Sequence, residues 1–312
     1  MNMKLRGHET FFIRKGWLTK GMKYVSRYPD VFTAKESDRK PMDVLGIGSN
    51  MVLSLRYWLQ VVGLTEETKG EKGRRVQNFT PFGELVFKND KYIEEIGTLY
   101  LLHYKLASNF ENATSWFYFF NRLKLSEFTE DDFFTGLSKF LAENGYDKEV
   151  SKRLVSDDFS CIVSTYISKS KSSNSELSAE DNIDCPLGEL NLVDAVSKKK
   201  GVITYKKSVP SAKSFDPYII LAAINGKRQE DEKSGKNAAL EIPLNTLMTD
   251  DNSIGKIFNL EAIALLDVLH SVEKTGELKI IRTAGLDVIR LEHDYSFDEC
   301  VQKYYEHLNE RE

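Results

Sequence analysis

The chain has 312 residues, of which 41% are hydrophobic and 11% aromatic. This length and composition predict two or three domains with buried cores and exclude a disordered chain. The net charge of −4 excludes a uniformly basic nucleic-acid coat. An acidic body can still carry local basic patches.

The three cysteines, Cys161, Cys185 and Cys300, are far apart and form no CxxC pair. We therefore expect neither a disulfide framework nor a thiolate zinc site, and a reducing cytoplasm fits this cysteine usage. The charged N-terminus does not have the pattern of a signal peptide. No apolar run reaches the roughly 18 residues that a membrane span needs, so we expect no membrane association.

The first 25 residues mix basic side chains, such as Arg14 and Lys15, with aromatic ones, such as Trp17. This mixture suits phosphate contacts combined with base stacking. The alternative is an N-terminal helix with buried aromatic residues and solvated lysines, and it is favoured because aromatic residues mostly lie in cores.

A helix is predicted from residues 48 or 49 to 62, because Gly48 or Ser49 can cap its start and Gly63 its end. Apolar side chains recur with helical spacing on one face, which predicts that this face is buried. The opposite face can contact base edges and phosphates, or it can be an ordinary solvated surface. Its side chains are Ser49, Asn50, Leu53, Arg56, Tyr57 and Gln60.

The segment KGEKGRR at residues 69–75 carries a net charge of +3 and two glycines, which is typical of a mobile basic hairpin. Thr80 followed by Pro81 then predicts the start of another helix. The order helix, basic hairpin and helix is that of a winged-helix module, which usually places one helix in a DNA major groove. Its candidate DNA contacts are Ser49, Asn50, Arg56, Tyr57, Gln60, Lys72, Arg74 and Arg75.

The middle of the chain, residues 111–178, is predicted to be helical and to end in a serine-rich linker at 168–178. His103 lies in an apolar helix that precedes it, where a histidine is more often a satisfied core residue than a base. Asp157 and Asp158 are adjacent, so capping or ion pairing is a better interpretation than a shared metal site.

The acidic group Glu180, Asp181 and Asp184 is a candidate Mg²⁺ site, although a turn with solvated acids is the favoured interpretation. A predicted helix and two short strands at residues 240–295 suggest a second winged-helix-like module. The predicted fold is thus mainly α with some β (α+β). We expect a winged-helix domain at 1–110, a helical region at 111–178 and a winged-helix-like domain at 179–312.

No P-loop, GxGxxG, HExxH or GxSxG string and no standard nuclease motif occurs. Three segments nevertheless resemble one family: GHETFFIRKGWLTKG, LGIGSNMVLSLRYWL, and the stretch from FTPFG to GTLYLLHYKLA. They are similar to a bacterial domain-of-unknown-function family encoded beside DNA phosphorothioation genes, whose best-described members are SspB-type proteins.

The resemblance implies a DNA nickase in an antiviral defence system, which opens one strand so that sulfur can replace a phosphate oxygen. The implied partners are DNA, a cysteine desulfurase, an ATP-pyrophosphatase-type enzyme and an ATPase. Phosphodiester hydrolysis needs an activated water and cationic charge stabilisation, often with Mg²⁺ or Mn²⁺. The densest suitable set is His8, Glu9, Arg14 and Lys15, although His8 could instead close a turn and Glu9 pair with an arginine.

Two other functions stay open at this stage. The chain could be a non-catalytic DNA-binding adaptor that recruits the sulfur-transfer enzymes, which the lack of a nuclease motif favours. It could also be a protein–protein scaffold or a homodimer, because Leu53 and Tyr57 are expected to be exposed on the predicted recognition helix.

Overall fold

The computed structural model describes residues 3–34, 40–70, 73–167, 185–236, 238–283 and 286–311. Within these ranges the chain divides into two compact units. Unit 1 lies within Met1–Phe119 and Leu123–Lys207, and unit 2 consists of Phe120–Arg122 and Ser208–Glu312. Unit 1 includes both the predicted 1–110 region and, apart from Phe120–Arg122, the middle region, and the N-terminal segment hydrogen-bonds to Asp158 of the middle region.

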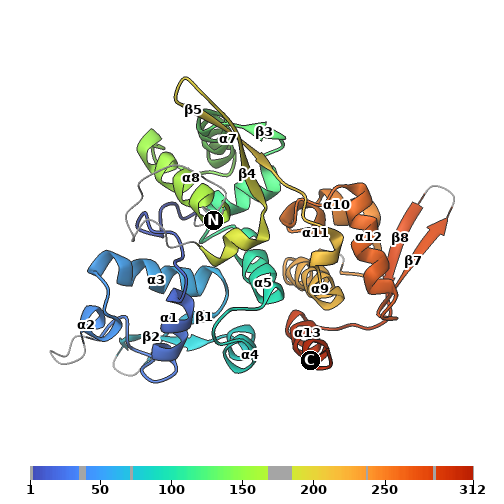
Figure 1. Ribbon diagram of the computed structural model, residues 1–312, viewed down its shortest axis with the longest axis horizontal. Helices are drawn as coiled ribbons and strands as arrows, with labels where there is room; N and C mark the ends of the chain where they lie inside the picture. The colour runs from blue at the N-terminus through green and yellow to red at the C-terminus, as the bar shows by residue number, and fades with distance from the viewer. Residues whose placement is uncertain are drawn as a thin grey trace. The chain divides into compact units, whose positions relative to one another are not determined.

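The N-terminal part of unit 1 contains the helix–hairpin–helix order expected from the sequence (Figure 1). The hairpin β1–β2 pairs Thr65 with Phe79 and Lys69 with Arg75. Thr80 caps the following helix by accepting a hydrogen bond from the Gly83 amide at 2.9 Å, as predicted. The elements are α1 (Trp17–Val25), α2 (Pro41–Leu45), α3 (Ser49–Val61), β1 (Thr65–Lys69), β2 (Arg75–Phe79) and α4 (Pro81–Asn89).

The remainder of unit 1 is a helical layer with a small antiparallel sheet of order β3-β5-β4. Its core is rich in aromatic side chains, among which Trp116, Tyr104 and Phe119 are almost completely buried. His103 is also buried, and its Nδ1 lies 2.7 Å from the Tyr166 hydroxyl, which confirms a satisfied core histidine. The elements are α5 (Ile96–Ala107), α6 (Thr114–Phe117), the π-helical η2 (Tyr118–Arg122), whose last three residues belong to unit 2, β3 (Glu127–Phe128), α7 (Glu130–Glu143), α8 (Lys152–Tyr166), η4 (Pro186–Leu190), β4 (Val193–Lys199) and β5 (Val202–Lys207).

Unit 2 packs helices α9, α12 and α13 against one another and carries a second antiparallel sheet of order β6-β8-β7. The predicted helix and two strands are present, and β6 adds a third strand to them. The charged segment 226–233 forms the C-terminal part of α9. The elements are η5 (Ala212–Ser214), α9 (Pro217–Lys233), β6 (Glu241–Pro243), α10 (Leu244–Thr249), α11 (Ile254–Ile257), α12 (Ala262–Glu273), β7 (Leu278–Thr283), β8 (Leu286–Leu291) and α13 (Phe297–Asn309).

The described residues are mainly helical with small antiparallel sheets, which confirms the predicted class. None of the helices in these residues is long and apolar enough to cross a membrane.

Candidate nucleic-acid interface

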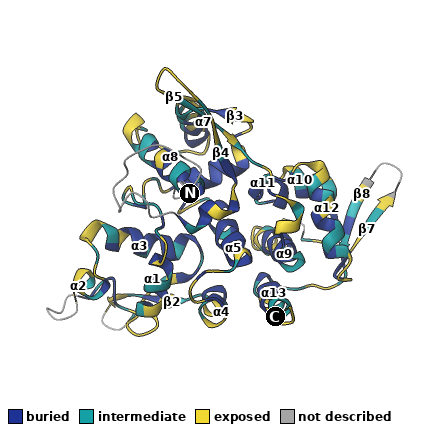
Figure 2. Cartoon of the chain, viewed as in Figure 1, coloured by how far each residue is buried: buried dark blue, intermediate teal, exposed yellow. Residues whose placement is uncertain are grey.

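The exposed start of α3 is the most accessible part of the predicted recognition helix. Ser49 and Asn50 are exposed, and the Leu53 side chain is 46% accessible to solvent. Figure 2 shows the start of this helix as exposed and most of the remainder as buried or intermediate. The buried face contains Leu55, Trp58 and Leu59, as the helical spacing predicts.

The expectation that Tyr57 is exposed is wrong, because its accessible fraction is only 6%. The N-terminal segment covers this side of α3: the Phe11 carbonyl accepts a hydrogen bond from Trp58 Nε1 at 2.8 Å. A Cβ on Gly7 would lie 2.3 Å from the Tyr57 ring, so only glycine fits there. The Tyr57 hydroxyl donates to the Asn112 carbonyl at 3.0 Å. Tyr57 therefore fixes the N-terminal segment onto α3 rather than presenting its ring to a ligand.

Arg56 of α3 and Arg75 of the hairpin share one carboxylate, that of Glu67. Arg56 Nε donates to Glu67 Oε2 at 2.8 Å, and Arg75 Nη1 lies 3.1 Å from Glu67 Oε1. The main chain of Arg56 is held as well, because the Gln60 and Gln77 side chains both donate to its backbone carbonyl. The two guanidinium groups are thus fixed relative to each other at the junction of helix and hairpin.

Lys4 adds a third cation that the sequence analysis did not identify. Its Nζ lies 5.0 Å from the centre of the Tyr57 ring. Burial lowers the pKa of Lys4, and the nearby Arg56 charge lowers it further, while Glu67 and Glu9 act in the opposite direction. A group whose pKa is perturbed by burial and by a neighbouring charge marks a candidate functional site. The only signal for Lys4 in the sequence was its position just before the RGHET string. We call Lys4, Arg56 and Arg75 the cationic cluster.

The hairpin extends this cluster with Arg74, which is half-exposed and lies 3.8 Å from Asp30. Lys69 at the end of β1 is exposed as well. The candidate DNA contact Lys72 lies outside the described residues. Gln60, another candidate, is partly buried at the end of α3.

His8, a member of the predicted catalytic set, is completely buried and not at the protein surface. Its Nδ1 accepts a hydrogen bond from the Thr10 amide at 3.1 Å, so the proton resides on Nε2, which donates to Asp158 Oδ1 at 2.7 Å. The ring stacks on Trp58 and meets Trp116 edge-on. In this conformation His8 closes the turn, which is the alternative interpretation of its role.

Asp158 is the acceptor that organises this buried network. It also receives the Arg6 amide at 2.9 Å on Oδ1 and the Ser115 hydroxyl on Oδ2. Its neighbour Asp157 faces the other way, with Oδ2 at 2.9 Å from Arg6 Nε. Both aspartates have polar partners, as the preferred interpretation of the pair predicted.

The segment from Arg6 to Thr10 has an unusual backbone. Arg6, Glu9 and Thr10 have φ values of 55°, 49° and 69°, in the left-handed region that side chains other than glycine rarely adopt. Such strain persists only where surrounding contacts enforce it, and it is concentrated at functional sites. The Asp158 network enforces it here, and it places the partly exposed Glu9 near Lys4.

Arg14 and Lys15 lie in different surroundings from His8. The Arg14 guanidinium lies 5.8 Å from the Phe11 ring and 5.5 Å from the Trp17 ring. The exposed Lys15 lines a cavity of about 230 Å³ between α1, the loop before α5 and the 3₁₀ helix η4. The structure therefore does not bring His8, Glu9, Arg14 and Lys15 together as one group.

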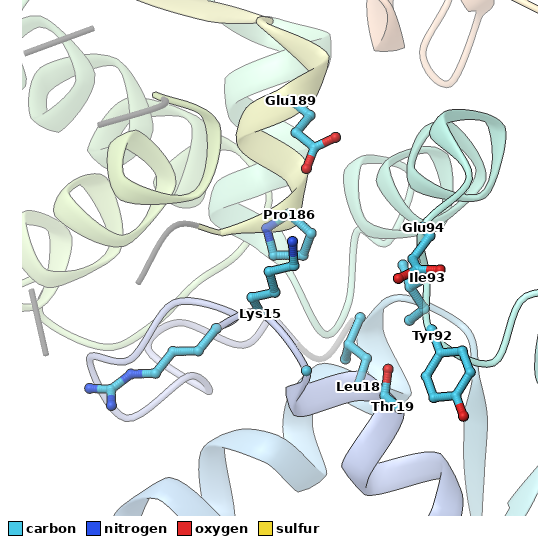
Figure 3. A pocket seen from close by; sticks show the side chains of 10 residues that line it. Lys15, Leu18, Thr19, Tyr92, Ile93, Glu94, Pro186 and Glu189 are labelled. Atoms are coloured by element: carbon cyan, nitrogen blue, oxygen red, sulfur yellow. The ribbon is translucent and has the colours of Figure 1, made fainter. Parts of the chain in front are cut away.

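The cavity beside Lys15 gathers side chains that sequence spacing could not connect. Figure 3 shows Lys15 extending toward Pro186, with the Glu189 carboxylate above it and the Glu94 carboxylate on the opposite wall. No ion pair found in the described ranges involves these three charged groups. The Ile93 backbone next to Glu94 has a φ of 55°, an outlier for a β-branched residue.

The described residues contain no group of three or more histidine, cysteine, aspartate or glutamate side chains placed to hold a metal ion. The candidate ligands Glu180, Asp181 and Asp184 lie outside the described residues.

Comparisons with known proteins place this geometry in context. A family model described as a protein of unknown function, DUF4007, matches residues 5–305. The structure described as "Magnesium ion-bound SspB crystal structure" is similar with a TM-score of 0.81 and 24% identity, over 97% of this chain and 88% of that chain. The structure described as "SspB crystal structure" has a TM-score of 0.79 and 24% identity, over 99% and 87% of the two chains. No curated protein matches the chain.

Proposed function

Because the chain belongs to the DUF4007 family and has the fold of SspB, we propose that it is the DNA-binding component of a DNA phosphorothioation system. The observation that carries the proposal is the cationic cluster at the junction of α3 and the β1–β2 hairpin. Lys4, Arg56 and Arg75 come from three separate segments; Arg56 and Arg75 share the Glu67 carboxylate, and the Arg56 charge acts on Lys4. Convergent cations next to an exposed helix suit a DNA backbone that runs past a groove-reading element.

The proposed mode of binding is that of a winged helix. The first turn of α3, with Ser49, Asn50 and Leu53, would face the major groove, while the β1–β2 hairpin would contact the neighbouring phosphates through Arg74 and Arg75. Glu67 neutralises part of the cluster in the free protein. A DNA phosphate can replace this carboxylate as the partner of Arg56 and Arg75, since guanidinium groups bind both anions in the same two-point geometry.

Measured DNA affinity as a function of salt concentration tests this proposal. The slope of log K against log salt should fall by about 1 for each phosphate contact removed, as in Arg75→Ala or Lys4→Ala. Lys139→Ala is the matched control, because Lys139 is an exposed lysine of the same unit whose one ion-pair partner among the described residues is Glu143. An unchanged slope in both cluster variants would exclude this surface as the DNA site.

Strand nicking is the second candidate function, and the cavity beside Lys15 favours it. Hydrolysis forms a bond from a water oxygen to phosphorus and breaks one phosphodiester P–O bond. A glutamate of the cavity, Glu94 or Glu189, can accept the proton of the attacking water, and the Lys15 ammonium can stabilise the charge on the phosphate. Arg14 from the predicted set also lines the cavity and would then assist binding, whereas Glu9 lies outside it, and the buried His8 would position the segment.

Mg²⁺ or Mn²⁺ fits this cavity only in part. Mg²⁺ commonly uses one or two protein carboxylates together with phosphate oxygens. Glu94 and Glu189 supply two carboxylates, fewer than a site built from protein alone requires. If bound there with a phosphate, the ion would polarise that phosphate, and these two glutamates would hold it. SspB itself has been crystallised with a magnesium ion.

A supercoiled-plasmid relaxation assay with added Mg²⁺ or Mn²⁺ tests the nicking proposal. Lys15→Ala, Glu94→Gln and Glu189→Gln should each slow relaxation by at least about 100-fold, the usual contribution of one acid–base or charge-stabilising group. Lys139→Ala again serves as control. No relaxation by the unaltered protein would leave a DNA-binding adaptor, which recruits the cysteine desulfurase, ATP-pyrophosphatase-type enzyme and ATPase of the system.

A further inference from the structure

The strand β5 is paired along its whole length on one edge only. β4 pairs with β5 from Val202 to Lys207, whereas β3 pairs only with Tyr205 and Lys206. β3 ends at Phe128 because the Thr129 side chain caps the start of α7 and the chain continues as that helix. Among the described residues, therefore, no strand lies against the other edge of β5 at residues 202–204.

The backbone of Ile203 points to this open edge. Lys200 and Gly201 have φ values of 50° and 86°, which define a two-residue turn between the paired Lys199 and Val202. The two residues that flank such a turn hydrogen-bond to each other through both backbone groups. Along the strand, successive residues then direct their amide and carbonyl alternately toward the partner strand and away from it. The Ile203 amide and carbonyl consequently face away from β4. Among the described residues, Ile203 also forms no backbone hydrogen bond with a turn or a loop.

A cavity of about 300 Å³ lies along the same edge. One wall is the first turn of α7, with Glu130 and Asp131, and the floor includes the rings of Phe159 and Tyr205. Lys152 also lines the cavity and is paired with Asp131 at 2.8 Å, while Glu130, whose charge acts on Lys152 as well, forms no ion pair with any described residue. Burial raises the pKa of Tyr205, and the nearby Glu130 charge raises it further, so this carboxylate acts on the aromatic floor.

We propose that the open edge of β5 binds an extended peptide segment of a partner protein, which adds a strand opposite Val202–Thr204 and places a lysine or arginine side chain in the cavity. Strand addition satisfies the Ile203 amide and carbonyl, and a pocket beside the edge selects one side chain. The aliphatic part of a basic side chain would lie against Phe159 and Tyr205, with its cation at Glu130. The unpaired Glu130 disfavours a nucleic-acid phosphate here, so this surface is distinct from the cationic cluster.

The binding of labelled pentapeptides to the full chain tests the proposal. The probes have the sequence Thr-Val-Xaa-Val-Thr with lysine, alanine or glutamate at the central position, and fluorescence anisotropy measures their affinity. The lysine peptide should bind best, by about tenfold or more over the glutamate peptide. Glu130→Gln should remove most of this preference while leaving the weaker binding of the alanine peptide unchanged.

The Ile203→Pro variant tests strand addition itself. Proline removes the amide donor at the open edge, and its position does not donate to β4, so the hairpin should persist. All peptides should lose about tenfold or more in affinity, whereas Ile203→Val, which keeps the amide, should bind as the unaltered chain does. If Ile203→Pro alters the circular dichroism spectrum, Glu130→Gln and the peptide series still decide the matter.

Three results would overturn the proposal. The first is that none of the peptides binds, and the second is that Ile203→Pro binds them undiminished. The third is self-association of the unaltered chain in sedimentation that Ile203→Pro abolishes, since the edge would then bind a second copy. None of these results bears on DNA affinity, so failure here and failure of the proposed function are distinguishable.

Discussion

Replacing Asp158 with alanine should destabilise unit 1 strongly, because this buried carboxylate accepts three hydrogen bonds. The donors are the Arg6 amide at 2.9 Å, His8 Nε2 at 2.7 Å and the Ser115 hydroxyl. His8, Ser115 and Asp158 are all at most 1% exposed. Each buried donor left without a partner costs about 1–3 kcal/mol, so we expect a loss of about 3–5 kcal/mol in the free energy of unfolding.

The adjacent Asp157 provides the matched control. It contacts Arg6 Nε at 2.9 Å, but the two side chains are 25% and 42% exposed. Exposed ion pairs contribute little, so Asp157→Ala should cost no more than about 1 kcal/mol. The two substitutions remove the same chemical group from neighbouring positions of one helix, but the two carboxylates differ in burial and in the number of donors that they bind.

Urea denaturation followed by tryptophan fluorescence measures this difference. Trp17, Trp58 and Trp116 all belong to unit 1, so the signal reports that unit. Trp58 and Trp116 also contact the His8 ring, with ring centres 6.2 Å and 5.5 Å away. Equal stability of Asp158→Ala and Asp157→Ala would refute the assignment of Asp158 as the residue that holds the N-terminal segment.

Three further predictions follow from the same contacts. Gly7→Ala should cost about 1–3 kcal/mol in the same assay, because its Cβ would lie 2.3 Å from the Tyr57 ring, whereas Gly48→Ala, with no contact closer than 4.0 Å, should cost far less. Cys161 and Cys300 should resist a disulfide reagent until the chain unfolds, because burial raises the pKa of both thiols, that of Cys300 to about 12. Immediate labelling of either thiol in the folded chain would contradict this. DNA affinity should begin to fall below the ordinary lysine pKa of 10.5 as the pH rises, because the lowered pKa of Lys4 makes it lose its charge early. Lys4→Arg keeps its charge and should show a later fall, and identical pH profiles would exclude Lys4 from the interface.

The regular elements of the chain could be predicted because their signals are local. Thr80, Thr129 and Ser49 stand at the starts of helices or at their caps, and the glycines of the 69–75 segment lie in a hairpin. One local signal is ambiguous: Asp90 has the residue type of a helix cap, but α5 starts at Ile96. Asp90 instead accepts the Glu94 and Glu95 amides in the turn before it.

The candidate site was harder to predict because it depends on an irregular segment. Helical spacing placed Tyr57 on the open face of α3, and nothing in that spacing reveals that residues 4–13 lie across it. The glycine at position 7 was the available clue, since the chain approaches the Tyr57 ring so closely there. Glu94 and Glu189 are separated from Lys15 by long stretches of chain, and only the folded structure brings them to one cavity.

The π-helical segment Tyr118–Arg122 lies where the chain passes from one unit into the other. Phe120–Arg122 belong to unit 2, where Asn121 Oδ1 accepts the Asn252 amide at 2.7 Å and Arg122 pairs with Asp251. Unit 2 therefore cannot be encoded by the last third of the gene alone. A recombination event that exchanged residues 208–312 would leave Asn121 and Arg122 facing foreign partners, so selection should keep the two parts of this gene together during inheritance.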